Sequence, residues 1–189
     1  MKDTKGKLLE AARRIYLDEG AEAVTMRSVA RRVGVTPTAL YRHYESKEAL
    51  VDAVIASGFQ VFGAYLHRSL AGSTAAERLR LSGQAYLDFA LEQSEIYRTI
   101  FMAPRHHGGE ADPDPRKAST FRFLVDRVEE CIRSHDLRTG DAEDTALTIW
   151  AHVHGLVSLY LAGAIPMAEG EFRTVYRESL GRLFRGVGG

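Results

Sequence analysis

The sequence has few of the features that mark secreted or disulfide-bonded proteins. Among its 189 residues there is one cysteine, Cys131, so no intrachain disulfide can form. A chain with so little cysteine suits a reducing compartment, and we expect a cytoplasmic protein. Cys131 lies among apolar residues at helical spacing, which favours a packing role for it. Residues 1–14 contain no apolar signal-peptide region.

An excess of charge of either sign is also absent, because 25 Lys and Arg balance 25 Asp and Glu. The charges are unevenly distributed, however. Residues 1–50 hold ten basic and seven acidic side chains, a net charge of +3, and residues 51–189 hold 15 basic and 18 acidic ones, a net charge of −3. A basic N-terminal part suits contact with phosphate. Solubility alone would also explain so small a bias.

Motifs for catalysis or metal binding are missing. There is no nucleophile elbow, no Gly-rich phosphate loop and no His-Glu zinc helix, so we expect neither an enzyme nor a cofactor. His152 and His154 are two residues apart on an expected helix and would face different sides. His106 and His107 fall in the Gly- and Pro-rich stretch 103–115, which is typical of a mobile, solvated loop. We therefore expect no metal site.

Strand signals are absent as well, since no β-branched runs alternate and no Asn-Gly hairpin turn occurs. Apolar residues instead recur every three or four positions, which indicates an all-α protein of about nine helices. The expected helices are residues 5–19, 26–33, 37–44, 47–70, 74–93, 95–102, 116–135, 141–161 and 169–184, followed by a frayed end at 186–189.

One uncharged run is long enough to span a membrane. Residues 145–168 contain no Asp, Glu, Lys or Arg, and a span needs about 20 apolar residues. His152 and His154 lie in its middle, acidic residues flank it, and Pro166 ends it. These features favour a buried helix, and we expect no membrane contact.

The sequence does contain a pattern typical of a helix-turn-helix, TMRSVARRVGVTPTALYRHYESK at 25–47. Thr25 is a good N-cap for the first helix. Gly34 suits a tight turn that needs positive φ. Thr36 caps the second helix, and Pro37 occupies its first position, where a missing N–H costs little. Such a second helix is narrow enough to enter the DNA major groove.

The exposed side of this motif supplies the side chains that contact DNA in such helices. Arg and Thr can bind base edges, whereas Tyr, His and Lys suit the phosphate backbone. The predicted DNA-binding residues are Arg27, Thr36, Pro37, Thr38, Ala39, Tyr41, Arg42, His43, Tyr44 and Lys47. The alternative is a helical hairpin whose charges are merely solvated.

Together these residues resemble the N-terminal domain of the tetracycline-repressor (TetR) family over about residues 5–55. The resemblance rests on Ile15, Gly20, Ala30, Gly34-Val35, Leu40-Tyr41-Arg42-His43-Tyr44, Lys47 and Leu50. It implies that Tyr41, His43 and Lys47 contact phosphates. It also implies that Arg27, Thr36, Pro37, Thr38 and Arg42 occupy positions that often touch bases or backbone.

The resemblance further implies two domains, a helix-turn-helix DNA-binding domain at 1–48 and a ligand-binding and dimerisation domain at 49–189. In that family the chains pair through their last two long helices. A bound inducer then spreads the two heads off a palindromic operator. We therefore expect a sequence-specific DNA-binding transcriptional regulator, a homodimeric repressor released by a small effector.

Small residues at spacings of three and four in helix 141–161 favour close approach of another helix, and helix 169–184 has an apolar stripe. The predicted dimer interface is Ala151, Gly155, Leu156, Ser158, Leu159, Ala162, Phe172, Val175, Tyr176, Leu180 and Leu183. The core of a monomer would use the same residues.

Aromatic and Met side chains of the body suit a pocket for a small hydrophobic ligand, because no cluster of buried charges is evident. The candidate lining residues are Phe59, Phe62, Tyr86, Phe89, Tyr97, Phe101, Met102, Phe121, Leu124, Trp150 and His154. An ordinary helical core contains the same residue types. A second reading of the whole chain therefore stays open, namely a helical small-molecule binding or sequestering protein with a vestigial DNA-binding head.

Overall fold

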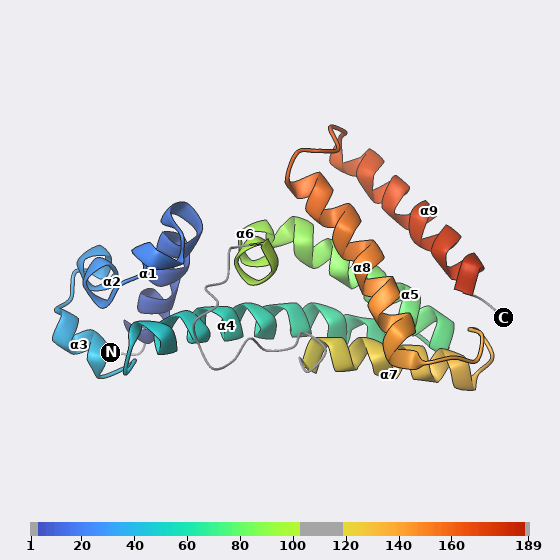
Figure 1. Cartoon of the computed structure of the whole chain (residues 1–189), viewed down its shortest axis with the longest axis horizontal. Coiled ribbons are helices and arrows are strands. Elements are labelled where there is room, and N and C mark those ends of the chain that lie inside the picture. Colours follow the sequence, from blue (N-terminus) through green and yellow to red (C-terminus); the bar gives the residue numbers. More distant parts are fainter. Residues whose placement is uncertain (1–3, 103–118, 188–189) are drawn as a thin grey trace. The chain divides into compact units, whose positions relative to one another are not determined.

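The computed structural model describes residues 4–102 and 119–187, and every regular element in those residues is helical (Figure 1). The α-helices are α1 (Thr4–Glu19), α2 (Met26–Val33), α3 (Pro37–Tyr41), α4 (Lys47–His67), α5 (Ala75–Glu92), α6 (Ser94–Tyr97), α7 (Ser119–Arg133), α8 (Ala142–Leu161) and α9 (Glu169–Val187). Two 3₁₀ turns, η1 (Ala21–Ala23) and η2 (Arg68–Ala71), and a π-helical turn, η3 (Arg98–Met102), complete the order. The all-α prediction is confirmed.

Thr25 and Thr36 cap α2 and α3, as the sequence predicted. The Asp141 carboxylate accepts the Asp144 N–H at 2.9 Å and so caps the start of α8. Three ends differ. Helix α3 stops at Tyr41 rather than near residue 44, α9 continues to Val187, and the single helix expected at 95–102 is α6 followed by η3. The loop predicted at 103–115 lies outside the described residues.

The described residues form two compact units, one within Met1–Val61 and Glu95–Asp112 and the other within Phe62–Ser94 and Pro113–Gly189. The first unit has its own apolar core, to which α1, η1's neighbour Val24, α2, α3 and the start of α4 contribute. Its buried residues are Leu8, Ala11, Ala12, Ile15, Tyr16, Val24, Met26, Val29, Ala30, Leu40, Tyr44, Leu50 and Val54. This core holds the helix-turn-helix in place.

The first unit also includes η3 and, from Glu95 on, the residues of α6. The reason is a close approach at Gly58 of α4, where a Cβ would lie 2.5 Å from Ile100 Cγ2 and 3.1 Å from Ile96 Cγ2. The Arg13 guanidinium on α1 also donates to the Glu95 carboxylate at 3.1 Å. Residues 95–100, which are distant in sequence, therefore pack on α1 and α4.

In the second unit, α8 and α9 form an antiparallel pair (Figure 1). Tyr160 stacks on Phe172 with ring centroids 3.9 Å apart, and Tyr176 donates its hydroxyl to the Gly83 carbonyl of α5 at 2.8 Å. Cys131 lies fully buried in this unit's core, as its helical spacing predicted, and burial raises the pKa of its thiol to about 11. The thiol is therefore protonated at neutral pH.

Among the described residues, one helical stretch, Lys47–Ala71, is long and apolar enough, by length and composition, to cross a membrane. Core helices pass the same test, and this stretch contributes buried side chains to packing in each unit. Leu50 and Val54 join the core of the first, whereas Phe62 and Tyr65 contact Phe89 in the second.

Candidate nucleic-acid interface

The turn between α2 and α3 is built by local hydrogen bonds. Thr25 and Ser28 cap the start of α2 reciprocally, each hydroxyl accepting the other's backbone N–H at 3.0 Å. Gly34 ends α2 with φ of 77°, in the left-handed region that glycine occupies without strain. Thr36 then caps α3 by accepting the Ala39 N–H at 3.3 Å. The two helices are thereby joined at a defined angle.

The residues of α3 and its ends separate into an exposed and a buried side. Leu40 is fully buried and Ala39 half-buried. The exposed side chains are Thr36, Pro37, Thr38, Tyr41, Arg42 and His43, with Arg27 exposed on α2. Tyr41 retains 56% of its surface although it is a large aromatic. These residues are free to meet a groove and its phosphates.

Tyr44 is the exception among the predicted DNA-binding residues. Its side chain is only 6% exposed and packs in the core of the first unit, so the prediction that it contacts phosphate is corrected. Burial raises the pKa of the phenol, and its hydroxyl has no hydrogen-bond partner among the described residues. The Lys5 ammonium lies 5.8 Å from the ring centroid. The sequence did not show the burial of Tyr44, because Tyr41 and Tyr44 are the same residue type in one motif. They differ only in the side of the turn after α3 on which they lie.

Lys47 lies at the first position of α4, where Ser46 caps the helix by accepting the Ala49 N–H at 3.1 Å. The unpaired N–H groups at such an end attract anions. Its ammonium donates to the Glu22 carboxylate of η1 at 3.0 Å. The sequence contained no local signal for this pair, because the partners are 25 residues apart.

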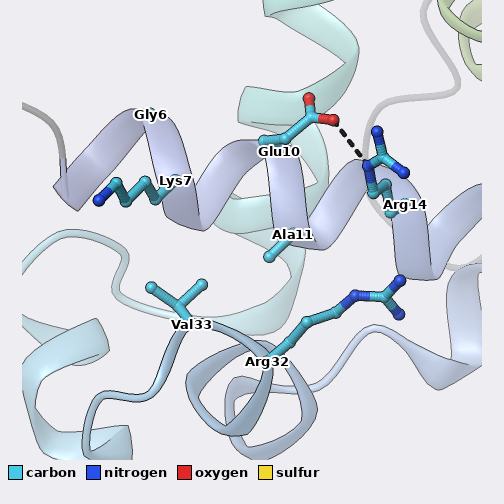
Figure 2. A pocket seen from close by; sticks show the side chains of 7 residues that line it. All are labelled: Gly6, Lys7, Glu10, Ala11, Arg14, Arg32 and Val33. Carbon is cyan, nitrogen blue, oxygen red and sulfur yellow. Dashed lines mark hydrogen bonds and ion pairs between the residues drawn. The ribbon is translucent and has the colours of Figure 1, made fainter.

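A hollow of about 610 Å³ lies between α1 and α2, on residues that the sequence analysis did not select (Figure 2). It is lined by Gly6, Lys7, Glu10, Ala11, Arg14, Arg32 and Val33. Glu10 accepts from Arg14 at 3.0 Å, and this hydrogen bond raises the pKa of the guanidinium. Arg32 lies 3.8 Å from Asp18. The hollow's arginines are thus already matched by carboxylates.

In the second unit, aromatic residues from the predicted ligand pocket surround a polar contact. The Tyr86 hydroxyl lies 2.9 Å from His154 Nδ1, and burial lowers the pKa of that imidazole. Phe62 packs edge-on against Tyr86, and Trp150 lies against His154 with ring centroids 5.6 Å apart. Phe89 and Phe121 extend the cluster through Phe62 and Trp150, and Leu124 packs on the neighbouring core.

The remaining four candidates belong to the first unit. Phe101 contacts Phe59 at 5.7 Å and Tyr97 at 5.1 Å between ring centroids, whereas Met102 is exposed. The sequence placed all eleven residues in one candidate pocket because composition does not show which helix packs on which. The structure assigns them to two groups in different compact units.

Helix α8 has one buried and one exposed face. Ala146, Ile149, Val153 and Val157 are buried. Leu147 and Leu159 are 39% and 49% exposed, and Ala151 and Ala162 are exposed beside them. The helix is therefore not buried all round by its own chain.

On α9 the predicted interface residues divide. Phe172, Tyr176 and Leu180 are buried within the chain, so we correct their assignment to a face between two copies. Val175 and Leu183 stay partly exposed, as do Gly155, Leu156 and Ser158 on α8.

Two protein-family models match the chain, one over its N-terminal part and one over its C-terminal part. Residues 8–54 match the model of the bacterial regulatory proteins of the tetR family. Residues 79–183, more than half of the chain, match a tetracyclin repressor-like C-terminal domain. The chain belongs to the TetR family. Its α1–α3 head is thus the family's helix-turn-helix DNA-binding domain, as the resemblance implied.

Curated TetR-family relatives include an activator and a repressor. The chain is 34% identical over 100 residues to the HTH-type transcriptional activator FasR of Mycolicibacterium smegmatis, covering 52% of this chain and 46% of FasR. It is 31% identical over 132 residues to the HTH-type transcriptional repressor KstR2 of Mycobacterium tuberculosis, covering 67% of this chain and 60% of KstR2. The chain therefore spans about half to three-fifths of the length of these relatives.

Solved TetR-like structures agree over nearly the full chain. A Rhodococcus sp. RHA1 protein of unknown function superposes with a TM-score of 0.80 at 27% identity, covering 98% of this chain and 95% of that one. The ketosteroid transcriptional regulator KstR2 of Mycobacterium tuberculosis superposes with a TM-score of 0.67 at 19% identity, covering 100% and 97%. At this identity the second match shows the fold alone.

Proposed function

We propose that this chain is a homodimeric, cytoplasmic transcriptional repressor that binds a palindromic operator and is released by a small hydrophobic effector. The observation that carries the proposal is the exposed side of α3, where Thr36, Thr38, Tyr41, Arg42 and His43 surround a helix anchored by buried Leu40. A short, capped helix with this exposure fits the major groove. The membership of the head in a DNA-binding family supports the same conclusion.

Within this surface we propose two roles. Arg42, at the end of α3, reads a base, since arginine can bind guanine O6 and N7 together. Lys47, at the start of α4, holds a phosphate and carries no sequence information. Arg27, Thr36, Pro37, Thr38 and Ala39 belong with the reading side, and Tyr41 and His43 belong with the phosphate side.

The test uses a duplex selected from a random pool by the wild-type protein, with binding followed by fluorescence anisotropy. Arg42→Ala should reduce discrimination at one base position by about 1–3 kcal/mol, roughly five- to 150-fold. Lys47→Ala should weaken all duplexes alike and lower the salt slope by about 0.9 for each head. Equal losses on every duplex from both changes would refute the division of roles. Failure to select any duplex would refute DNA reading itself.

The exposed apolar face of α8 supports the proposed homodimer. Leu147, Ala151, Leu159 and Ala162 lie opposite the buried face, and a second copy would cover them. A dimer would present two heads to half-sites separated by about 34–36 Å or a multiple of it. Each small head then contributes only part of the affinity.

For the effector, the cluster around Tyr86 and His154 is the proposed contact. Aromatic walls with one polar pair suit an apolar molecule that carries a hydroxyl or carbonyl. KstR2 is described as a ketosteroid regulator, which matches this chemistry. An effector should lower operator affinity when added. If the protein selects no duplex but still binds the molecule, the alternative of a small-molecule sequestering protein is favoured instead.

The direction of regulation is the remaining part of the proposal, since FasR is an activator and KstR2 a repressor. We propose repression. A reporter gene placed behind the selected duplex should fall in expression when the protein is supplied. A rise in expression would contradict repression and leave DNA binding intact.

A further inference from the structure

Glu22 forms an ion pair with Lys47, the residue that is proposed to bind a DNA phosphate. The Lys47 Nζ to Glu22 Oε2 distance is 3.0 Å, and the glutamate side chain is 71% exposed while that of the lysine is 28% exposed. The carboxylate thus lies on the surface beside the Lys47 ammonium. A phosphate bound by Lys47 would have to share that space with another anion.

The backbone presents both partners from fixed positions. Glu22 lies in η1, whose neighbour Val24 is fully buried and whose Ala23 carbonyl accepts the Ser28 hydroxyl at 2.8 Å. Lys47 opens α4, whose first turn is capped by Ser46. The pair therefore forms by bringing two ordered segments together, not by chance contact of two flexible loops.

We propose that Glu22 is an internal counter-ion that competes with the DNA backbone for Lys47 and limits operator affinity. The inference rests on the proposed DNA-binding function. It follows from charge, because the Lys47 ammonium attracts an anion. A carboxylate held there satisfies that attraction in the free protein and repels the phosphate in the complex.

The ion pair between Glu22 and Lys47 is expected to add little to the stability of the fold. An ion pair with so exposed a carboxylate contributes little to stability, since water screens it and side-chain ordering offsets its attraction. Its larger effect is expected when a polyanion approaches. Attenuated binding lets an effector release the operator more readily, because less binding free energy must be overcome.

The experiment measures affinity and its salt dependence for Glu22→Gln on the duplex selected by the wild-type protein. Affinity should rise roughly two- to fivefold for each head engaged, the range of a surface ion pair. The slope of log affinity against log salt should steepen by up to about 0.9 for each head. Glu22→Asp retains the charge and should stay close to the wild type.

Two controls separate a specific pair from a general change of charge. Glu19→Gln removes the same charge from the same head, at a carboxylate 4.0 Å from Arg32, and should change affinity less. In a Lys47→Ala background, Glu22→Gln should lose its effect, as a double-mutant cycle requires for coupled residues. Circular dichroism checks that each variant is folded.

The inference is overturned if Glu22→Gln weakens binding, leaves it unchanged, matches Glu19→Gln, or acts equally with and without Lys47. Weakened binding would make Glu22 a residue that orients Lys47 for phosphate. A wild-type protein that selects no duplex would instead refute the proposed function, so the two failures are distinguishable.

Discussion

Tyr41 and Tyr44 show how three positions in sequence separate a binding residue from a core residue. Helix α3 ends at Tyr41, and the His43 and Tyr44 N–H groups both donate to the Leu40 carbonyl, at 2.8 and 3.1 Å. This turn directs Tyr41 outward and Tyr44 into the core. Two tyrosines of the same motif therefore have different chemical roles.

Removal of each hydroxyl tests this difference. Tyr44→Phe should leave DNA affinity within about twofold and raise the free energy of unfolding by up to about 1 kcal/mol, because it removes a buried hydroxyl without a partner. Tyr41→Phe should keep stability and lower affinity roughly two- to tenfold by losing a hydrogen bond to phosphate. Urea unfolding and anisotropy measure the two quantities. A loss of DNA affinity in Tyr44→Phe would contradict the burial of its hydroxyl.

His154 predicts a pH dependence of stability. Burial lowers its pKa in the folded protein below the usual value of 6.5. Below pH 6.5 the unfolded chain therefore binds a proton that the folded chain does not. The stability contributed by neutral His154 is complete above pH 6.5 and is lost as the pH falls through 6.5 towards the folded pKa.

The matched variant is His154→Asn, which keeps a polar group near the Tyr86 hydroxyl but cannot titrate. Between pH 7 and pH 5 the wild type should lose more free energy of unfolding than the variant, by urea unfolding at one protein concentration. An equal loss in both proteins would show that His154 titrates normally in the folded state.

At the scale of elements, α4 and η3 pack closely against each other at Gly58. A π-helical turn such as η3 is uncommon and often occurs at functional sites. A Cβ on any other residue at position 58 would lie 2.5 Å from Ile100 Cγ2 of this turn. The close fit explains why a segment from the middle of the chain packs with the head's helices.

Gly58→Ala should lower the free energy of unfolding by about 1–2 kcal/mol, because Ile100 is β-branched and buried and cannot move aside cheaply. Gly63→Ala is the control on the same helix, with no atom within 4 Å of its added Cβ. It should raise stability by up to about 1 kcal/mol through helix propensity. Equal shifts in urea midpoint for both variants would contradict the close fit at Gly58.

At the scale of the whole molecule, the proposed homodimer depends on the exposed face of α8. Leu159→Glu should shift the protein to monomer, with a dissociation constant raised roughly tenfold or more, because a charge would be buried against the partner. Sedimentation equilibrium measures the dissociation constant. Operator affinity should fall with it, since two heads no longer bind together.

Leu70→Glu is the matched control, since Leu70 on η2 is 50% exposed and Leu159 49%. It should remain dimeric. If Leu159→Glu also remains dimeric at the same protein concentration, the proposed α8 interface is wrong. If both variants become monomeric, the effect follows from adding charge and not from this helix face.

The helix-turn-helix was predictable because its signals are local. Thr25, Gly34, Thr36 and Pro37 each act on a backbone group within four residues, and helical periodicity repeats within one turn. The α-helical class, the position of the helix-turn-helix and the caps of α2 and α3 follow from such short-range rules. A sequence read alone contains them in full.

Contacts between distant segments were decided by tertiary structure alone. The burial of Tyr44, the pairing of Glu22 with Lys47 and the approach of Ile100 to Gly58 each depend on how separate helices pack. The same packing divides the aromatic residues between two units and turns Phe172, Tyr176 and Leu180 inward. Composition and spacing state which side chains are apolar. Only the folded chain determines which of them face each other, because that depends on contacts between residues tens of positions apart.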